Sequence, residues 1–197
     1  MDNLKEDVAE FRENKHNVDP LFLNRWSPRA MSGESIDDKE LMALFEAARW
    51  APSSYNNQSW RFVYAKRDEE NWDNFLDLLV DGNKVWAKNG SALVVILSKK
   101  TFDYNGKFSR THSFDTGAAW QNFALEGSRR GLVVHGMQGF DYEKAHTLVD
   151  ADEELEVEAM VVVGKPGKVE SLPKDLREGE KPSGRKNLDK IVFNGSF

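Results

Sequence analysis

A continuous apolar run of strand length, Ala92-Leu93-Val94-Val95-Ile96-Leu97, constrains the fold of this chain more than any other feature. A strand with one wet face alternates apolar and polar residues, whereas an unbroken run predicts an interior strand covered on both faces. Further strands are expected over 61–65, 131–137 and 155–163, and residues 191–193 could add a last one. Strands that alternate with helices predict an α+β fold (an α/β sandwich), with a central four- to five-stranded mixed or antiparallel sheet covered by helices.

Helices are predicted between these strands. Asp37 and Glu40 form a capping box, and the residues that follow it, at the spacing of a buried helical face, are Leu41, Leu44, Phe45 and Ala48. Pro52 is expected to stop this helix. A second helix is expected over 69–80, broken by Asp81-Gly82-Asn83, and another near Tyr142. A long helix over 113–130 has small residues among its expected inner positions, which fits a central helix, a subunit interface or simple tight packing: Phe114, Gly117, Ala118, Gln121, Ala124, Leu125 and Ser128.

Composition narrows the class of protein. The chain has 197 residues, of which 40% are hydrophobic, so a single domain over 1–197 is expected, with a peripheral N-terminal segment (1–20) and an extended C-terminal arm (168–197). The absence of cysteine excludes disulfides, thiolate metal sites and a cysteine nucleophile. No apolar run is long enough to span a bilayer and none resembles a signal peptide, which favours the cytoplasm and no membrane partner. A net charge of −6 is a poor match to nucleic-acid binding.

Two stretches carry groups suited to a ligand. Residues 52–60, Pro-Ser-Ser-Tyr-Asn-Asn-Gln-Ser-Trp, place hydroxyls and amides between a helix and a strand, as a polar planar ligand would need. In the extended segment that ends at Pro28, the side chains of Arg25, Ser27 and Arg29 share one face. Two guanidiniums that flank a hydroxyl suit a phosphate clamp, although solvated surface charge is the simpler interpretation.

Other chemistries lack their motifs. The four histidines have no metal-ligand spacing, and His135, in an apolar strand, is interpreted as a satisfied interior or interface histidine. Ser53 and Ser54 stand in no nucleophile-elbow pattern, and no strand is followed by G-x-G-x-x-G or a P-loop. Trp50 and Trp60 are expected to be core aromatics beneath the polar loop. Three aromatic residues of the loop 98–110 could cover a substrate or merely pack, namely Phe102, Tyr104 and Phe108.

Several motifs occur in a set order along the chain: Arg-Trp-Ser-Pro-Arg at 25–29, Glu-Ala-Ala-Arg-Trp-Ala-Pro-Ser-Ser at 46–54 with Asn56, Gln58 and Trp60, Gly82-Asn83 with Trp86, Gly131-Leu132 leading to Gly139-Phe140-Asp141, Val162-Val163-Gly164, and Gly184-Arg185-Lys186. This order of motifs resembles the FMN-dependent nitroreductase family. The resemblance covers about 24–192. It implies a homodimer with two FMN sites at the subunit interface.

The resemblance also implies roles for individual residues. Arg25 and Arg29, with Trp26 and Ser27 beside them, would hold the phosphate and pyrimidine edge of FMN, and Arg185 would complete the phosphate site. The flavin ring would contact Asn83 and the backbone of Met137, Gln138 and Gly139. Residues contributed by the partner subunit would be Pro52, Ser53, Ser54 and Asn56. No side chain need act as an acid or base, because flavin N5 accepts the hydride.

The implied activity is an oxidoreductase that takes hydride from NAD(P)H and reduces a small electron-poor acceptor, such as a nitroaromatic or a quinone, by a ping-pong mechanism. Two alternatives are an FMN-binding or storage protein with little turnover, and a related enzyme with different flavin chemistry, such as dehalogenation. The sequence departs from the family at two positions. Ser59 replaces a usual proline, which predicts a less stiff loop, and Ala87 stands where some members have a lysine near the flavin.

Overall fold

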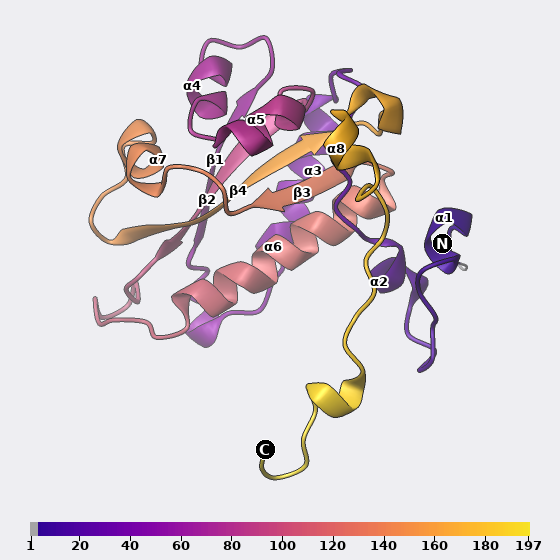
Figure 1. Cartoon of the computed structure of the whole chain (residues 1–197). Helices are drawn as coiled ribbons and strands as arrows, with labels where there is room; N and C mark the ends of the chain where they lie inside the picture. The colour runs from indigo at the N-terminus through magenta and orange to yellow at the C-terminus, as the bar shows by residue number, and fades with distance from the viewer. Residues whose placement is uncertain (1–3) are drawn as a thin grey trace.

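In the computed structural model, which describes residues 4–197, the chain forms a four-stranded antiparallel sheet in the order β1-β2-β4-β3 (Figure 1). The strands are β1 (Trp60–Lys66), β2 (Ala92–Lys99), β3 (Val133–Met137) and β4 (Leu155–Gly164). Strand β2 is paired on both edges and is buried from Ala92 to Ser98. The apolar run is therefore the interior strand that its sequence predicts, and the α+β class is confirmed.

Helices cover both faces of the sheet (Figure 1). On one face α3 (Asp38–Arg49) and α6 (His112–Arg129) pack over side chains such as Val94 and Ile96. On the other face α4 (Trp72–Leu76), α5 (Asp81–Ala87) and α7 (Tyr142–Leu148) pack over Leu93, Val95 and Leu97. Alternate side chains of a strand point to opposite faces, so one apolar strand supplies both halves of the core. No helix within residues 4–197 is long and apolar enough to cross a membrane.

The remaining elements are short. At the N-terminal side lie α1 (Glu6–Ala9) and α2 (Pro20–Asn24), and the C-terminal arm contains α8 (Lys174–Arg177). Single 3₁₀ turns occur at η1 (Ser54–Asn56), η2 (Val169–Ser171) and η3 (Leu188–Lys190). The expected strand at 191–193 does not form. Ile191, Val192 and Phe193 are exposed, and the end of the arm extends away from the sheet (Figure 1), so no strand edge is beside it to pair with.

The capping box of α3 is confirmed, because the Asp37 side chain accepts from the Lys39 N–H at 2.8 Å and Glu40 reaches back to the Asp37 N–H. The prediction for Trp50 is wrong, since its side chain is 73% exposed. Trp50 follows the last turn of α3, where its indole N–H donates to Glu46 at 2.8 Å on the solvent side of the helix. Trp60, by contrast, is buried as predicted.

The helix expected over 69–80 is interrupted, and Asp81-Gly82-Asn83 begins α5 instead of breaking a helix. The cause is tertiary pairing. Leu79 forms a β-bridge with Phe140, and the Val80 N–H donates to the Gly139 carbonyl at 3.1 Å. These contacts extend the backbone at Val80, so a new helix starts after it.

The buried face of α6 agrees with the prediction at Ala124 and Ser128 but is turned away from Phe114, Gly117 and Gln121. Asp115, Ala119, Phe123 and Ala124 face the core, whereas Phe114 is 80% exposed. Gly117 and Gln121 are also exposed, one and two turns further along the same side as Phe114. This exposed stripe of α6 has no covering element within residues 4–197.

Candidate functional site

Arg25 lies just after α2, at the start of a segment without regular structure that runs to Ala30. Its guanidinium donates to the Ser27 hydroxyl at 3.3 Å, so these two side chains do share one face as the sequence predicts. Arg29 lies elsewhere, with its guanidinium carbon 6.0 Å from the Trp86 ring centre. Trp26 is half-buried within the same segment.

A residue that sequence reasoning missed, Arg12, joins this segment to the C-terminal arm. Its Nη1 donates to the Leu23 carbonyl and to the Arg25 carbonyl, the latter at 2.8 Å, and its Nε donates to the Ser183 carbonyl at 3.0 Å. Arg185 donates to the same Ser183 carbonyl at 3.3 Å. We call Arg12, Arg25 and Arg185 the arginine cluster. Nothing in the sequence marks Arg12 for this place beyond its being an arginine in a polar segment.

The arginine cluster concentrates positive charge without a carboxylate. Within residues 4–197, no ion pair joins Arg12, Arg25 or Arg185 to an acidic side chain. Burial lowers the pKa of Arg25, and the nearby Arg185 lowers it further. Burial lowers the pKa of Arg12 too, followed by the charges of Arg185 and Arg25. Partly desolvated like charges are costly, and a bound anion would relieve that cost.

The side chains of Glu180 and His135 form hydrogen bonds to the backbone around Arg29. The Glu180 Oε1 atom accepts from the N–H groups of Arg29 and Ala30 at 2.7 and 2.8 Å, and the other oxygen of Glu180 is buried without a partner within residues 4–197. His135 of β3 lies 2.8 Å from the Pro28 carbonyl, which can only accept, so its Nδ1 carries the proton. His135 is therefore satisfied, as predicted, and its side chain is partly buried.

We expect the free energy of unfolding to depend less on pH, on the acid side of neutrality, in His135→Asn than in the wild type. Burial is the main cause that lowers the pKa of His135, so the folded state protonates less readily than the unfolded chain, whose imidazole has a pKa of about 6.5. The stability that the neutral imidazole of His135 contributes is fully present above pH ~6.5, and it is lost as the pH falls from there toward the lowered pKa of the folded state. Asparagine keeps a donor but does not titrate. Urea unfolding between pH 5 and 8 tests this, and parallel curves for the two proteins would contradict it.

The polar loop (residues 52–60) is held by two of its own buried side chains, Asn57 and Ser59, and by Asp115 of α6. The Ser54 N–H donates to Asp115 of α6 at 3.0 Å. Asn57 donates to the Ser59 hydroxyl at 3.1 Å and accepts from the Asp103 N–H at 2.9 Å. Ser59 therefore takes part in the hydrogen bonds that fix the loop where a proline would have stiffened it. Asp115 carries no signal in the sequence beyond its place in a predicted helix.

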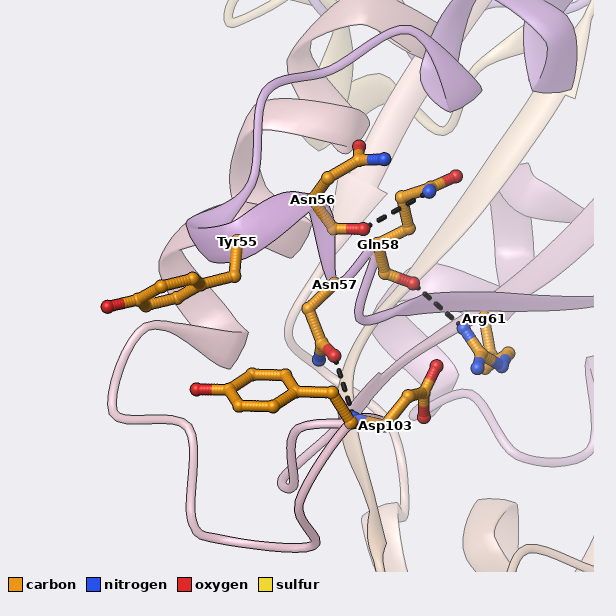
Figure 2. A pocket seen from close by; sticks show the side chains of 7 residues that line it. Tyr55, Asn56, Asn57, Gln58, Arg61 and Asp103 are labelled. Carbon is orange, nitrogen blue, oxygen red and sulfur yellow. Dashed lines mark hydrogen bonds between the residues drawn. The ribbon is translucent and has the colours of Figure 1, made fainter.

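The loop backbone takes a shape that ordinary residues adopt rarely. Tyr55, Asn56 and Gln58 have φ of 52°, 54° and 51°. Left-handed backbone at residues other than glycine persists when the surroundings enforce it, and it clusters at functional sites. A surface pocket of about 390 Å³ lies here, lined by Tyr55, Asn56, Asn57, Gln58, Arg61, Asp103 and Tyr104. Figure 2 shows Asn57 pointing to the Asp103 backbone and Arg61 to the Gln58 carbonyl.

The structure brings together another predicted pair. The Asn83 side chain donates to the Gly139 carbonyl at 3.0 Å, and a side chain at Gly139 would lie 2.8 Å from Asn83 Nδ2. Gln138, next to it, is exposed, and Met137 is buried at the end of β3. Ala87 is fully buried in the core, and Lys84 is paired with Asp77 at 2.8 Å. Neither position offers a free cation.

Two of the predicted groups lie apart within one chain: the loop residues Pro52 to Asn56 and the arginine cluster. Pro52 to Asn56 are held at the N-terminal end of α6 by Asp115. The arginine cluster lies beside α2, which Figure 1 shows along the other half of α6. No hydrogen bond or ion pair that involves residues 4–197 alone joins the two groups.

Two aromatic residues of the loop after β2, Phe102 and Tyr104, lie against Tyr55 of the polar loop. Tyr55, Phe102 and Tyr104 lie with ring centres 5.4 to 5.8 Å apart. Tyr104 and Tyr55 are largely exposed, and Phe102 is half-buried. Phe108 lies apart from them, against His112 at 5.6 Å.

Known proteins match both the sequence and the fold of this chain. A model of the nitroreductase family matches residues 23–85. A crystal structure of an oxidoreductase containing FMN is 42% identical, covers 94% of this chain and 96% of its own, and has a TM-score of 0.91. The chain belongs to the nitroreductase family. The family match spans Arg25 to Asn83 and leaves out Arg12 and Arg185.

More distant relatives match most of the chain. A provisional nitroreductase from Desulfovibrio desulfuricans, solved in complex with FMN, is 23% identical, covers 92% of this chain and 99% of its own, and has a TM-score of 0.70. A Polynucleobacter asymbioticus protein, provisionally named NADH dehydrogenase/NAD(P)H nitroreductase, is 22% identical over 182 residues, which are 83% of this chain and 92% of its own length.

Proposed function

We propose that this nitroreductase family member is an FMN-dependent oxidoreductase that uses NAD(P)H to reduce a small electron-poor acceptor. The observation that carries the proposal is the arginine cluster, whose positive charges have no acidic partner within residues 4–197. A phosphate monoester carries close to two negative charges at neutral pH and accepts hydrogen bonds on three oxygens. Guanidiniums match such oxygens in both charge and geometry.

The residues of the site fit FMN in kind. Arg25 and Arg185, with Ser27, would hold the phosphate, and Trp26 and Arg29 would lie toward the ring. Asn83 and the backbone of 137–139 would supply polar contacts to the flavin, since Asn83 already lies against Gly139. The chemistry that FMN supplies when it is bound is two-electron transfer from NAD(P)H to an acceptor such as a nitroaromatic or a quinone. The protein's part would be to bind and orient.

We further propose that the site is completed by a second copy of this chain. Support comes from the loop residues 52–56 and the arginine cluster, which lie apart along α6 within one chain. Phe114, Gly117 and Gln121 leave one side of α6 uncovered, and Ile191 to Phe193 leave the arm exposed. Pro52, Ser53, Ser54 and Asn56 would then reach the partner's cofactor.

Light scattering should give twice the mass of one chain, and Gly117→Arg should shift the measured mass toward that of the monomer and weaken FMN binding. A wild-type monomer that binds FMN would contradict the split site.

The direct test of the function is optical. The purified protein, or protein supplied with FMN, should show the yellow flavin spectrum, and anaerobic NADH or NADPH should bleach it rapidly. Protein that stays colourless with added FMN would overturn the proposal. Flavin that binds but is not bleached by either nucleotide would favour the storage alternative, for which the buried Ala87 in place of a lysine is the supporting observation.

A further inference from the structure

We infer that Arg12, which lies outside the family match, is a positioning residue of the anion site. It would hold the two phosphate-binding arginines, Arg25 and Arg185, at the spacing that one phosphate group requires. The inference rests on the proposed function for its ligand, and it assigns part of the FMN site to the N-terminal segment.

The first support is the geometry of a single side chain that bonds three backbone carbonyls. Arg12 donates to Leu23 and Arg25 on one side and to Ser183 on the other. Arg25 lies 13 residues from Arg12 in sequence, and Ser183 lies 171 residues away. Because Arg185 also bonds the Ser183 carbonyl at 3.3 Å, Arg12 and Arg185 share an acceptor. A planar guanidinium with fixed donor directions therefore sets the separation of the two chain segments.

The second support is that Arg12 is itself held in place. Its N–H donates to the Val8 carbonyl at 3.0 Å, which places it one turn after the short helix α1. Val8 is fully buried, and the Lys5 N–H donates to the Asn24 side chain at 2.9 Å. The N-terminal segment thus packs against α2, directly before Arg25. Because Arg12 is itself held in place, it can fix the positions of the Arg25 and Ser183 carbonyls that it bonds.

The third support is electrostatic. The arginine cluster includes no ion pair to an acidic side chain within residues 4–197, so placing a third cation there does not neutralise an existing negative charge. Burial lowers the pKa of Arg12, and the nearby charges of Arg185 and Arg25 lower it further. A cation in this place is explained when the occupant of the cluster is an anion.

The test compares FMN with riboflavin, which lacks the phosphate, by fluorescence titration of flavin-free protein. In Arg12→Ala the affinity for FMN should fall on the order of tenfold, as expected for loss of charge-assisted contacts, while riboflavin affinity stays within about twofold. Arg49→Ala is the matched control, because Arg49 is exposed and paired with Glu46 at 2.6 Å. It should change neither affinity. Equal losses for both flavins, or none for FMN, would overturn the inference.

Thermal stabilisation by inorganic phosphate separates this inference from the proposed function. Phosphate should raise the melting temperature of the wild type and raise that of Arg12→Ala less. A wild type that responds to phosphate but binds no flavin would refute FMN as the ligand and keep the anion site. A wild type that responds to neither would refute both. If Arg12→Ala does not fold, Arg12→Lys gives the same comparison, because an ammonium keeps the charge but cannot span the same carbonyls.

Discussion

Replacing Arg25 with alanine should lower the affinity for FMN by about 100-fold or more, because truncating one member of a partly desolvated charge pair costs roughly 2–5 kcal/mol. Arg25 is half-buried, bonds Ser27 and carries no carboxylate partner within residues 4–197, so its charge is available to the phosphate. Fluorescence titration of flavin-free Arg25→Ala with FMN measures the loss.

Two controls define this result. Riboflavin affinity should change little in Arg25→Ala, and Arg49→Ala should bind both flavins as the wild type does. The stability of the flavin-free variant should stay equal or rise, since removing Arg25 relieves the repulsion within the arginine cluster. A parallel loss of FMN and riboflavin affinity, or a fall in stability that accounts for the lost binding, would contradict the assignment of Arg25 to the phosphate.

Replacing Gly167 with alanine should destabilise the fold by roughly 3 kcal/mol or more, as overpacking against backbone does when nothing can move aside. A β-carbon there would lie 2.4 Å from the Met31 carbonyl carbon, 2.6 Å from its oxygen and 2.8 Å from the Ser32 nitrogen. These backbone atoms are fixed by two hydrogen bonds. The Gly167 N–H donates to Ala30 at 2.9 Å, and the Ser32 N–H donates to Lys165 at 3.0 Å. Urea unfolding of the purified variant measures the change.

Gly82 provides the matched control, because a β-carbon there meets no atom within 4 Å and the residue lies inside α5. Gly82→Ala should be neutral or stabilise by up to about 1 kcal/mol, as alanine favours helix over glycine. Gly167→Ala should also weaken FMN binding, since Ala30 directly follows Arg29. An unfolding free energy for Gly167→Ala within about 1 kcal/mol of the wild type would contradict this prediction, because it would show that the backbone around Met31 moves aside at little cost.

Much of the fold could be predicted because its signals are local. Six consecutive apolar residues require burial on both faces, which identifies β2 without any knowledge of its partners. Asp37 and Glu40 cap α3 through bonds to atoms within three residues. Asp141 likewise caps α7, where its side chain accepts from the Lys144 N–H at 2.9 Å. Such signals depend on spacing alone, and spacing is visible in the sequence.

The errors arise where distant contacts decide the outcome. The helix before Val80 is broken by pairing with Gly139, some sixty residues away, and no local pattern reveals that contact. Phe114 is predicted among the inner positions of its helix, yet Ala119 and Phe123 are the residues of α6 that pack into the core. Trp50 is a similar case. It is the first residue after α3, and the direction of its side chain depends on how the chain turns there, which the helical spacing does not predict.

The candidate site divides in the same way. Arg25 and Ser27 could be paired from sequence because an extended segment places them on one face. Arg12, Asp115 and Glu180 could not, since each acts through backbone atoms of a segment remote in sequence: Asp115 on Ser54, 61 residues away, and Glu180 on Arg29, 151 residues away. Backbone atoms carry no residue identity that a motif could record.

The bond from Arg12 to Ser183 also has a kinetic consequence. Contacts across 171 residues are among the last that a folding chain can form, because the loop must close before the contact gains anything. The sheet and its two helical layers can therefore assemble before the anion site exists. Hydrogen exchange should show the amides near Arg25 and Ser183 opening first in flavin-free protein and closing on cofactor capture, so that capture would be the final step of folding.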